Sequence, residues 1–327
     1  MQPLVTIAIP TYKRLNYLKE AVASALNQSY EPIQILIGQD PSDNGLDKEI
    51  KEWVMEVAIN NPKVKYFFNE KNLGLAGHWN ALISEASGEY MMIIGDDDRL
   101  LPDAVEKLMF VVLPDKNVAF SNHFLIDQNG SRLVDESLHN TKKFNRDKLQ
   151  EGMIENPTGT VWQNAVPISA TIMRKEDIKR LRFKEDLNTP EIELFLRLAN
   201  EGARFYFIPD YTVEYRIHSQ SATHSGLKVH HLLNYLIPME VGNKNDIYKK
   251  KFIQKLIGSA VNLHIKDGHV KEARKLYMSP YYPLKLKISP KGVVQFVCIC
   301  FPSILSIKIL NFFSRLSFIY ELLRKSY

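Results

Sequence analysis

The chain of 327 residues is long enough for one large domain or two ordinary ones, and its 45% hydrophobic and 24% charged residues are typical of a globular protein. The net charge of +5 is unevenly distributed: residues 285–327 carry seven basic residues against Glu321 alone, a local +6, so the remaining 284 residues sum to −1. A folded body without excess positive charge argues against nucleic acid as a partner.

The beginning of the chain, residues 1–7, has no basic region ahead of its apolar stretch and no small-residue cleavage site. We therefore expect a first strand there rather than a secretory signal. The two cysteines, Cys298 and Cys300, are separated by one residue, a spacing that predicts neither a disulfide nor a zinc site. This cysteine usage favours the reducing cytoplasm.

Strand and helix patterns alternate through the first hundred residues. We expect strands at 4–9, 33–37, 64–68 and 90–94, and helices at 17–26, 48–59, 79–86 and 102–113. This alternation predicts a mostly parallel sheet flanked by helices on both faces. The loops after Ile9, Ile37 and Ile94 should then converge at the carboxyl ends of the strands, where open α/β sheets bind ligands.

The pattern is less regular in the middle of the chain and helical after it. We expect strands at 119–126, 204–208 and 213–217, a helix at 191–201, and mainly helices from 228 to about 277.

Three consecutive carboxylates, Asp96, Asp97 and Asp98, follow the apolar strand at 90–94. Crowded carboxylates repel one another unless a cation joins them, and hard oxygen ligands suit Mg²⁺ or Mn²⁺. A divalent ion held by one or two carboxylates usually completes its coordination shell with substrate phosphates. The alternative is a solvated acidic turn, because Asp also favours turns.

Three polar loops stand beside this triplet. The first, after strand 4–9, contains Tyr12, whose ring can stack on a base, and Arg14, which can approach a phosphate. The second contains Asp40, which can accept a hydrogen bond from a base or a ribose hydroxyl. The third contains Asn72 and Gly74 and opens a helix. No GxGxxG motif follows the first strand, which argues against a dinucleotide site.

These motifs, in this order, resemble glycosyltransferase family 2, the inverting nucleotide-sugar enzymes of GT-A fold. The matching motifs are Ile9-Pro10-Thr11-Tyr12, Leu26-Asn27-Gln28-Ser29-Tyr30, Asn72-Leu73-Gly74, Ala86-Ser87-Gly88-Glu89-Tyr90 and the aspartate triplet. The resemblance implies that the donor nucleotide is bound by Pro10, Thr11, Tyr12, Arg14, Asp40, Asn72, Gly74, Asp96 and Asp97. It also implies Mn²⁺ or Mg²⁺ held by Asp98, Asp97 and His218.

The resemblance extends more loosely to residue 223. In the run Pro190-Glu191-Ile192-Glu193, Glu191 falls where the family has its catalytic base, normally Asp, and Pro190 replaces the usual acid before it. Because a general base needs hydrogen-bond reach, Glu193 is a competitor for that role. Both glutamates are otherwise explained as first-turn acids favoured by the helix dipole.

The run Tyr215-Arg216-Ile217-His218 resembles the family's late Tyr-Arg-x-His segment. The resemblance implies that Arg216 contacts the donor diphosphate and that His218 binds the metal or the diphosphate. Two positions depart from the family pattern: Gly95 takes the first place of an Asp-x-Asp-Asp motif, two places ahead of the final pair, and Gln39 takes the first place of an Asp-Asp pair. These departures affect contacts with the ribose and the base more than metal binding.

By this resemblance we expect a GT-A catalytic domain at 1–225, with a nucleotide-sugar half (1–117) and an acceptor half (118–225), followed by a helical region at 226–327. The expected reaction moves a sugar from a nucleoside-diphosphate sugar, a UDP-sugar by preference, to a hydroxyl of a glycan or lipid-linked acceptor in surface polysaccharide synthesis. A nucleotidyltransferase with a similar crevice and a non-catalytic sugar-nucleotide-binding scaffold are the alternatives.

The most apolar stretch, Val293–Phe313, is long enough at 21 residues to span a bilayer, but Pro302 and Lys308 make it a poor spanning helix. Its basic flanks favour a helix pair lying in the interface of an anionic leaflet. Packing onto the catalytic domain and a true span are the alternatives. We therefore expect a cytoplasmic protein that is peripheral on the cytoplasmic face of the cell membrane, with a membrane-facing C-terminal region.

Overall fold

The computed structural model describes residues 2–42, 47–112, 117–218 and 226–313. The chain divides into two compact units, Met1–Gly226 and Leu227–Tyr327, and each has its own apolar core. Residues 219–225, which follow the Tyr-Arg-x-His segment, and residues 314–327 of the expected helical region lie outside the described residues.

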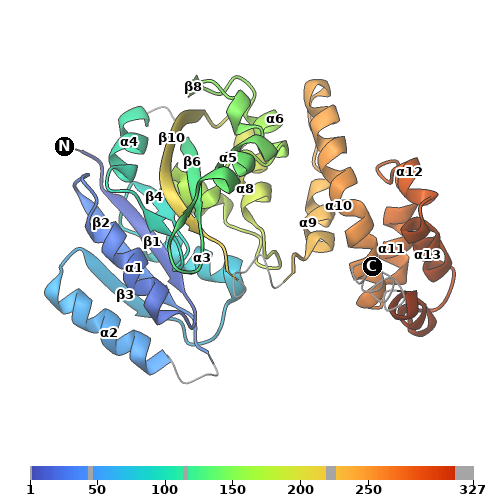
Figure 1. Ribbon diagram of the computed structural model, residues 1–327, viewed down its shortest axis with the longest axis horizontal. Helices are drawn as coiled ribbons and strands as arrows, with labels where there is room; N and C mark the ends of the chain where they lie inside the picture. Colours follow the sequence, from blue (N-terminus) through green and yellow to red (C-terminus); the bar gives the residue numbers. More distant parts are fainter. Residues whose placement is uncertain (1, 43–46, 113–116, 219–225, 314–327) are drawn as a thin grey trace. The chain divides into compact units, whose positions relative to one another are not determined.

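A central mixed sheet of ten strands builds the first unit within the described residues (Figure 1). Its main path runs β3 (Val64–Phe68), β2 (Ile33–Gln39), β1 (Val5–Thr11), β4 (Tyr90–Ile93), β9 (Thr171–Arg174), β6 (Val118–Ile126), β10 (Phe205–Arg216) and β5 (Arg99–Leu100). The short strands β7 (Arg132–Leu133) and β8 (Gly152–Met153) pair with β6 and β10.

The direction of the strands differs between the two ends of this sheet. Strands β3, β2, β1 and β4 are parallel, as the alternating pattern predicts. Strand β9 is antiparallel to both of its neighbours, β4 and β6, and β5 is antiparallel to β10. Strands β6 and β10 are again parallel to each other, so the sheet is mixed and the expected parallel arrangement holds for its first four strands and for this pair.

Eight α-helices occur in the described part of the first unit and pack around this sheet. They are α1 (Leu15–Leu26), α2 (Asp47–Asn60), α3 (Gly74–Glu85), α4 (Ala104–Val111), α5 (Val134–Lys143), α6 (Pro157–Trp162), α7 (Lys175–Leu181) and α8 (Glu191–Asn200). Spacing of three and four residues gives α1 an apolar face, and its Leu18, Ala21, Val22 and Ala25 are buried. Strand β1 is buried almost throughout because neighbouring elements cover both of its faces.

The predicted strands at 204–208 and 213–217 are one strand, β10. Its pairing with β6 is irregular between Phe207 and Val213, around Pro209, and this irregularity interrupts the alternating pattern. The carboxyl end of this continuous strand is Arg216. It lies beside Ile126, the carboxyl end of β6, because the two strands pair in parallel.

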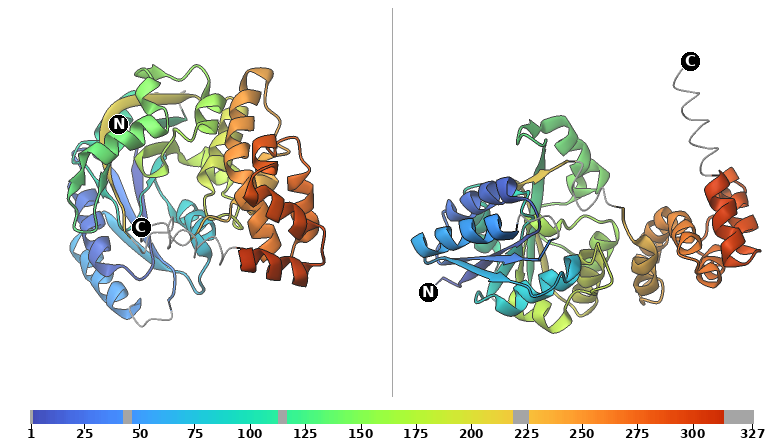
Figure 2. Two further views of the ribbon diagram at one scale, coloured as in Figure 1. Left: turned by 45° about the vertical axis from the view of Figure 1, so that its right-hand side comes forward. Right: turned by 90° about the horizontal axis from the view of Figure 1, so that it is seen from below.

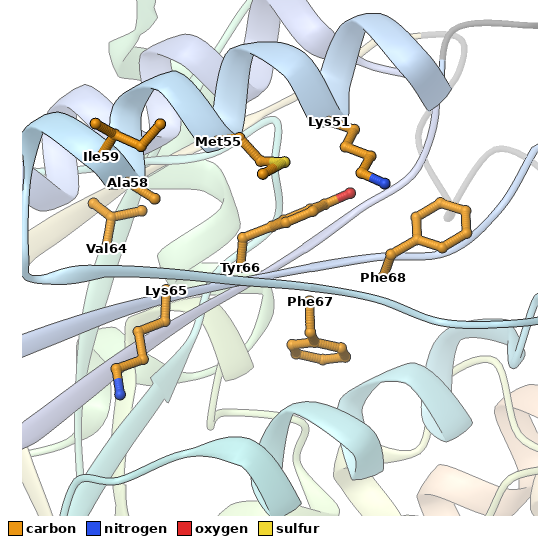
Figure 3. Close-up of a pocket in the computed structure, with 9 residues that line it drawn as sticks. All are labelled: Lys51, Met55, Ala58, Ile59, Val64, Lys65, Tyr66, Phe67 and Phe68. Carbon is orange, nitrogen blue, oxygen red and sulfur yellow. The ribbon is translucent and has the colours of Figure 1, made fainter.

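An open hollow of about 570 Å³ lies between α2 and the edge strand β3 (Figure 3). Met55 and Ile59 face it from the helix, and Val64 and Tyr66 face it from the strand. In the sheet order, β2 and β1 separate this hollow from β4, which precedes the aspartate triplet.

The second unit is helical, as expected (Figure 2). Its helices are α9 (Val229–Leu236), α10 (Asp246–Lys266), α11 (Val270–Tyr277), α12 (Leu284–Lys287) and α13 (Pro290–Ile299), and residues 303–313 are also helical. The apolar stretch 293–313 is therefore a pair of helices interrupted at Pro302, where Ser306 Oγ donates to the carbonyl of Cys298 at 2.6 Å. No helix within the described ranges is both long enough and apolar enough to cross a membrane.

Candidate active site

The aspartate triplet lies just beyond β4, beside the carboxyl end of β1. Asp96 is fully buried and its Oδ2 accepts hydrogen bonds from Thr11 Oγ1 at 2.8 Å and from the backbone N–H of Tyr12 at 3.1 Å. Its Oδ1 pairs with Arg14 Nη2 at 2.6 Å. Burial raises the pKa of Asp96 to about 6, against the opposing effect of Arg14. Asp96 therefore fastens the first loop to the end of β4.

Asp97 is where two distant parts of the chain meet. Its Oδ2 accepts from Arg14 Nη1 at 2.5 Å and lies 2.8 Å from His218 Nε2, although His218 is 121 residues away. A Cβ added at Gly95 would lie 2.4 Å from Asp97 Oδ1. A side chain at position 95 would thus displace a carboxylate that Arg14 and His218 hold, which gives the Gly95 departure a local steric reason.

Asp98 is buried and held from two sides. Its Oδ2 accepts from Ser169 Oγ at 2.8 Å, and its Oδ1 accepts from the backbone N–H of Arg216 at 3.1 Å. Burial, followed by the neighbouring charge of Asp97, raises the pKa of Asp98 to about 8. Ser169 lies in the short 3₁₀ turn Ile168–Ala170, and sequence analysis missed it because no local motif marks that turn.

Arg216 holds the end of β10 against the triplet. Its guanidinium is buried and donates to the carbonyl of Asp97 at 2.8 Å, to the carbonyl of Gln128 at 3.2 Å and to Glu20 Oε2 at 2.6 Å. It also lies over the ring of Tyr17, 4.5 Å from the centroid. Because every guanidinium nitrogen is engaged, this arrangement favours a positioning role for Arg216 over the expected contact with a diphosphate.

The predicted metal ligands are only partly brought together. Asp97 Oδ2 and His218 Nε2 meet, but in the part of the chain that the structure describes no three His, Cys, Asp or Glu side chains have the geometry of a metal site. A carboxylate beside an imidazole fits Mn²⁺ or Mg²⁺ that takes few protein ligands and leaves positions for phosphate oxygens. The donor set therefore fits a divalent ion held chiefly by Asp97 and His218, with Asp98 behind them.

The loops after β1 and β2 are joined at Asp40. Its backbone N–H donates to the carbonyl of Thr11 at 3.2 Å. The buried carboxylate accepts from Asn69 Nδ2 at 2.8 Å and from the backbone N–H of Leu73 at 3.1 Å, and His78 Nδ1 lies 3.7 Å away. Burial lowers the pKa of His78. Asp40 thus holds the backbone of the third loop in place. The contact with the nucleotide that the sequence predicts for Asp40 stays a prediction.

Other residues predicted to bind the nucleotide lie in or next to the loops that Asp40 joins, and some of them are exposed to solvent. Tyr12 is 38% exposed, and Lys13 Nζ lies 4.5 Å from the centroid of its ring. The exposed Asn72 accepts from the backbone N–H of Gly74 at 2.9 Å, and Gly74 has a φ of +68°, which suits glycine at the start of α3. Pro10, within β1, lies opposite Gly38 of β2.

The two candidate bases, both in the first turn of α8, have different surroundings. Glu193 is buried and forms a two-pronged ion pair with Arg197, at 2.7 Å to both Nε and Nη2. Glu191 is partly exposed, and no side chain of the described residues donates to its carboxylate. Burial raises the pKa of Glu191 to about 7. A carboxylate with that pKa and no fixed partner is suited to accepting a proton near neutral pH, whereas Glu193 is committed to Arg197.

Comparison with known proteins gives related sequences. The family model "Glycosyl transferase family 2" matches residues 6–174. Chondroitin synthase of Pasteurella multocida is 36% identical over 155 residues, which cover 46% of this chain and only 15% of that protein. The GalNAc(5)-diNAcBac-PP-undecaprenol beta-1,3-glucosyltransferase of Campylobacter jejuni is 23% identical over 307 residues, covering 92% of this chain and 94% of that protein.

Solved structures share the fold. TarS 1-349 of S. aureus, in complex with UDP-GlcNAc, has a TM-score of 0.63 and 13% identity, with 90% of both chains covered. The mannosyltransferase PcManGT of Pyrobaculum calidifontis, in complex with GDP-Man and Mn²⁺, has a TM-score of 0.57 and 14% identity, with 96% of this chain and 88% of that chain covered. At such identities the likeness concerns the fold alone, and it supports a GT-A arrangement.

The network around Arg216 gives a testable prediction. We expect Glu20→Ala to weaken Mn²⁺ binding several-fold and to lower Tm by a few degrees, because the buried guanidinium loses its carboxylate partner. Calorimetric titration with Mn²⁺ and thermal unfolding measure both effects. Glu31→Ala is the matched control, since Glu31 pairs with Lys63 at the surface. Unchanged Mn²⁺ affinity in Glu20→Ala would show that Arg216 does not position the aspartates through Glu20.

Proposed function

Since this chain belongs to glycosyl transferase family 2, we propose that it is an inverting enzyme that moves a sugar from a nucleoside-diphosphate sugar to an acceptor hydroxyl. The observation that carries this proposal is the Glu191 carboxylate, to which no side chain among the described residues donates and whose pKa of about 7 suits a general base. The meeting of Asp97 with His218 at the carboxyl ends of β4 and β10 supports a site for the donor diphosphate.

The proposed donor is a UDP-sugar, bound across the loops after β1, β2 and β3. Tyr12 supplies an exposed ring for the base, and Asn72 lies in the loop that Asp40 supports. Arg14, whose side chain is 20% exposed, is better situated than Arg216 to reach a diphosphate. The name of the TarS complex, which includes UDP-GlcNAc, supports the preference for uridine.

The proposed cofactor is Mn²⁺ or Mg²⁺, held by Asp97 and His218 with Asp98 behind them. When bound, such an ion supplies Lewis-acid stabilisation of the negative charge on the departing nucleoside diphosphate. The Mn²⁺ named with PcManGT supports divalent-metal dependence. Ser169 and the backbone N–H of Arg216 each donate to one oxygen of the Asp98 carboxylate and so fix its orientation.

In the proposed reaction Glu191 accepts the proton of the acceptor hydroxyl while that oxygen attacks the anomeric carbon of the sugar. The bond between the anomeric carbon and the diphosphate oxygen breaks on the opposite face, so the configuration at the anomeric carbon inverts. Arg197 keeps Glu193 away from this role.

We propose a glycan or lipid-linked glycan as the acceptor, in surface polysaccharide synthesis. The Campylobacter relative is named for an acceptor carried on undecaprenol diphosphate, and it aligns along most of its length. Such an acceptor is held at a membrane, so we propose that the protein is peripheral on the cytoplasmic face of the cell membrane.

Donor binding is the most direct test. We expect calorimetry with nucleoside diphosphates and nucleotide sugars to detect binding of a uridine compound in the presence of Mn²⁺, and EDTA to abolish that binding. Asp97→Asn keeps the shape of the side chain but removes its charge, so it should also lose metal-dependent binding. Binding of several nucleotides regardless of metal would contradict the proposed site. Metal-dependent binding without transfer would instead favour the scaffold alternative.

The base assignment predicts different effects at two neighbouring glutamates. We expect Glu191→Gln to lower kcat by about 10²- to 10⁴-fold and to leave donor affinity nearly unchanged, because only proton acceptance is lost. Glu193→Gln should mainly lower Tm, because it weakens the ion pair with Arg197. Steady-state kinetics and thermal unfolding separate the two. Near-normal kcat in Glu191→Gln would exclude Glu191 as the base.

The raised pKa of Glu191 predicts the pH profile. The base acts when deprotonated, and its carboxylate fraction rises as pH rises through about 7, so kcat should increase over that range and then level off. We expect this inflection to be absent from the residual activity of Glu191→Gln. An inflection near pH 7 that survives in the variant would assign the titration to another group.

A further inference from the structure

The two units carry opposite charge. Residues 227–327 contain 17 basic and 5 acidic residues, a net charge of +12, whereas residues 1–226 contain 25 basic and 32 acidic residues, a net charge of −7. No Asp or Glu occurs between Glu272 and Glu321. The positive charge is therefore a property of the whole helical unit and extends well before the apolar stretch 293–313.

The same unit exposes many large apolar side chains. Of the 22 such side chains in the described residues, 11 lie between Met278 and Phe313. Single exposed apolar side chains are normal on a soluble protein, but a concentration of this kind marks an interaction surface. The most exposed are Leu284, Ile288 and Ile304, each at 75%. Leu284 and Ile288 precede the stretch predicted from hydropathy.

Leu284 begins the short helix α12, and Ile288 follows directly after that helix. Leu284 and Ile288 are one turn apart, and Lys285 and Lys287 lie between them in the sequence. Residues 304, 308 and 312 follow one another at intervals of four, which places Lys308 between Ile304 and Phe312 on one side of the last helix.

The opposite faces of these helices are committed to the core of the unit. Cys298, Ile299 and Leu310 are buried there, and Gln295 donates to the carbonyl of Gly258 on α10 at 2.6 Å. Leu286 of α12 is partly buried against the same core, so the exposed apolar side chains belong to segments that also contact the core.

We propose that the helical unit docks on an anionic lipid bilayer, with Leu284, Ile288 and Ile304 inserted into the interface and the lysines beside them at the level of the headgroups. An uncharged apolar partner would leave the charge of +12 unexplained, and a nucleic acid would leave the apolar side chains unexplained. An anionic bilayer satisfies both, since lysine side chains extend toward charged headgroups while apolar neighbours enter the acyl boundary. The inference rests on the proposed function only in that a lipid-linked acceptor lies at such a surface.

The test is flotation of the full chain with vesicles of phosphatidylcholine, alone or mixed with phosphatidylglycerol. We expect binding to the mixed vesicles only, weakened by salt, and reduced on the order of tenfold or more in Leu284→Gln/Ile288→Gln. Phe110→Gln is the matched control, because it removes an apolar side chain that is 85% exposed but lies in the first unit. This variant should bind vesicles like the wild type. Circular dichroism checks that each variant is folded.

The outcomes separate this inference from the proposed function, because donor binding is measured by calorimetry on the same samples. Wild-type protein that ignores mixed vesicles, or prefers an oligonucleotide duplex to them, would overturn the docking surface even if donor binding is intact. Equal loss of vesicle binding in Phe110→Gln and in Leu284→Gln/Ile288→Gln would overturn it too. Vesicle binding without any nucleotide binding would instead overturn the proposed function.

Discussion

Three adjacent carboxylates in a buried turn are the constraint on which the first unit depends. Their mutual repulsion has to be offset, and the chain does this with cations and donors from distant segments: Arg14 after β1, and Arg216 and His218 at the end of β10. The strands must therefore end close together for the turn to be stable. The same requirement brings together the loops on which we propose that the donor binds.

Much of the first hundred residues can be predicted from the sequence because the signals there are local. Strand β3 has the predicted bounds, and β1 and β2 exceed theirs by two residues because their pairing continues through Thr11 and Gln39. The short strand β9 carries too little pattern to be recognised, since it is defined by its pairing with β4 and β6. Its antiparallel direction, together with that of β5, β7 and β8, makes the sheet mixed.

Within the candidate site, sequence analysis identified residues more readily than their contacts. Arg216 and Asp40 both lie at the site, but their partners Glu20 and Leu73 are far away in the sequence, so the supporting contacts could not be predicted from local patterns. The ion pair that distinguishes Glu193 from Glu191 can be predicted from the sequence. Glu193 and Arg197 are four residues apart, a spacing that favours an ion pair on a helix.

The position of β9 couples the two halves of the first unit mechanically. It lies between β4, which precedes the aspartates, and β6, which begins the second half of the sheet, and it starts two residues after Ser169. A sliding of one half against the other has to pass through β9 and would shift the hydroxyl that Asp98 accepts from. The orientation of Asp98 therefore depends on the register of β9, because a displacement of about one ångström is enough to lengthen a hydrogen bond beyond its useful range.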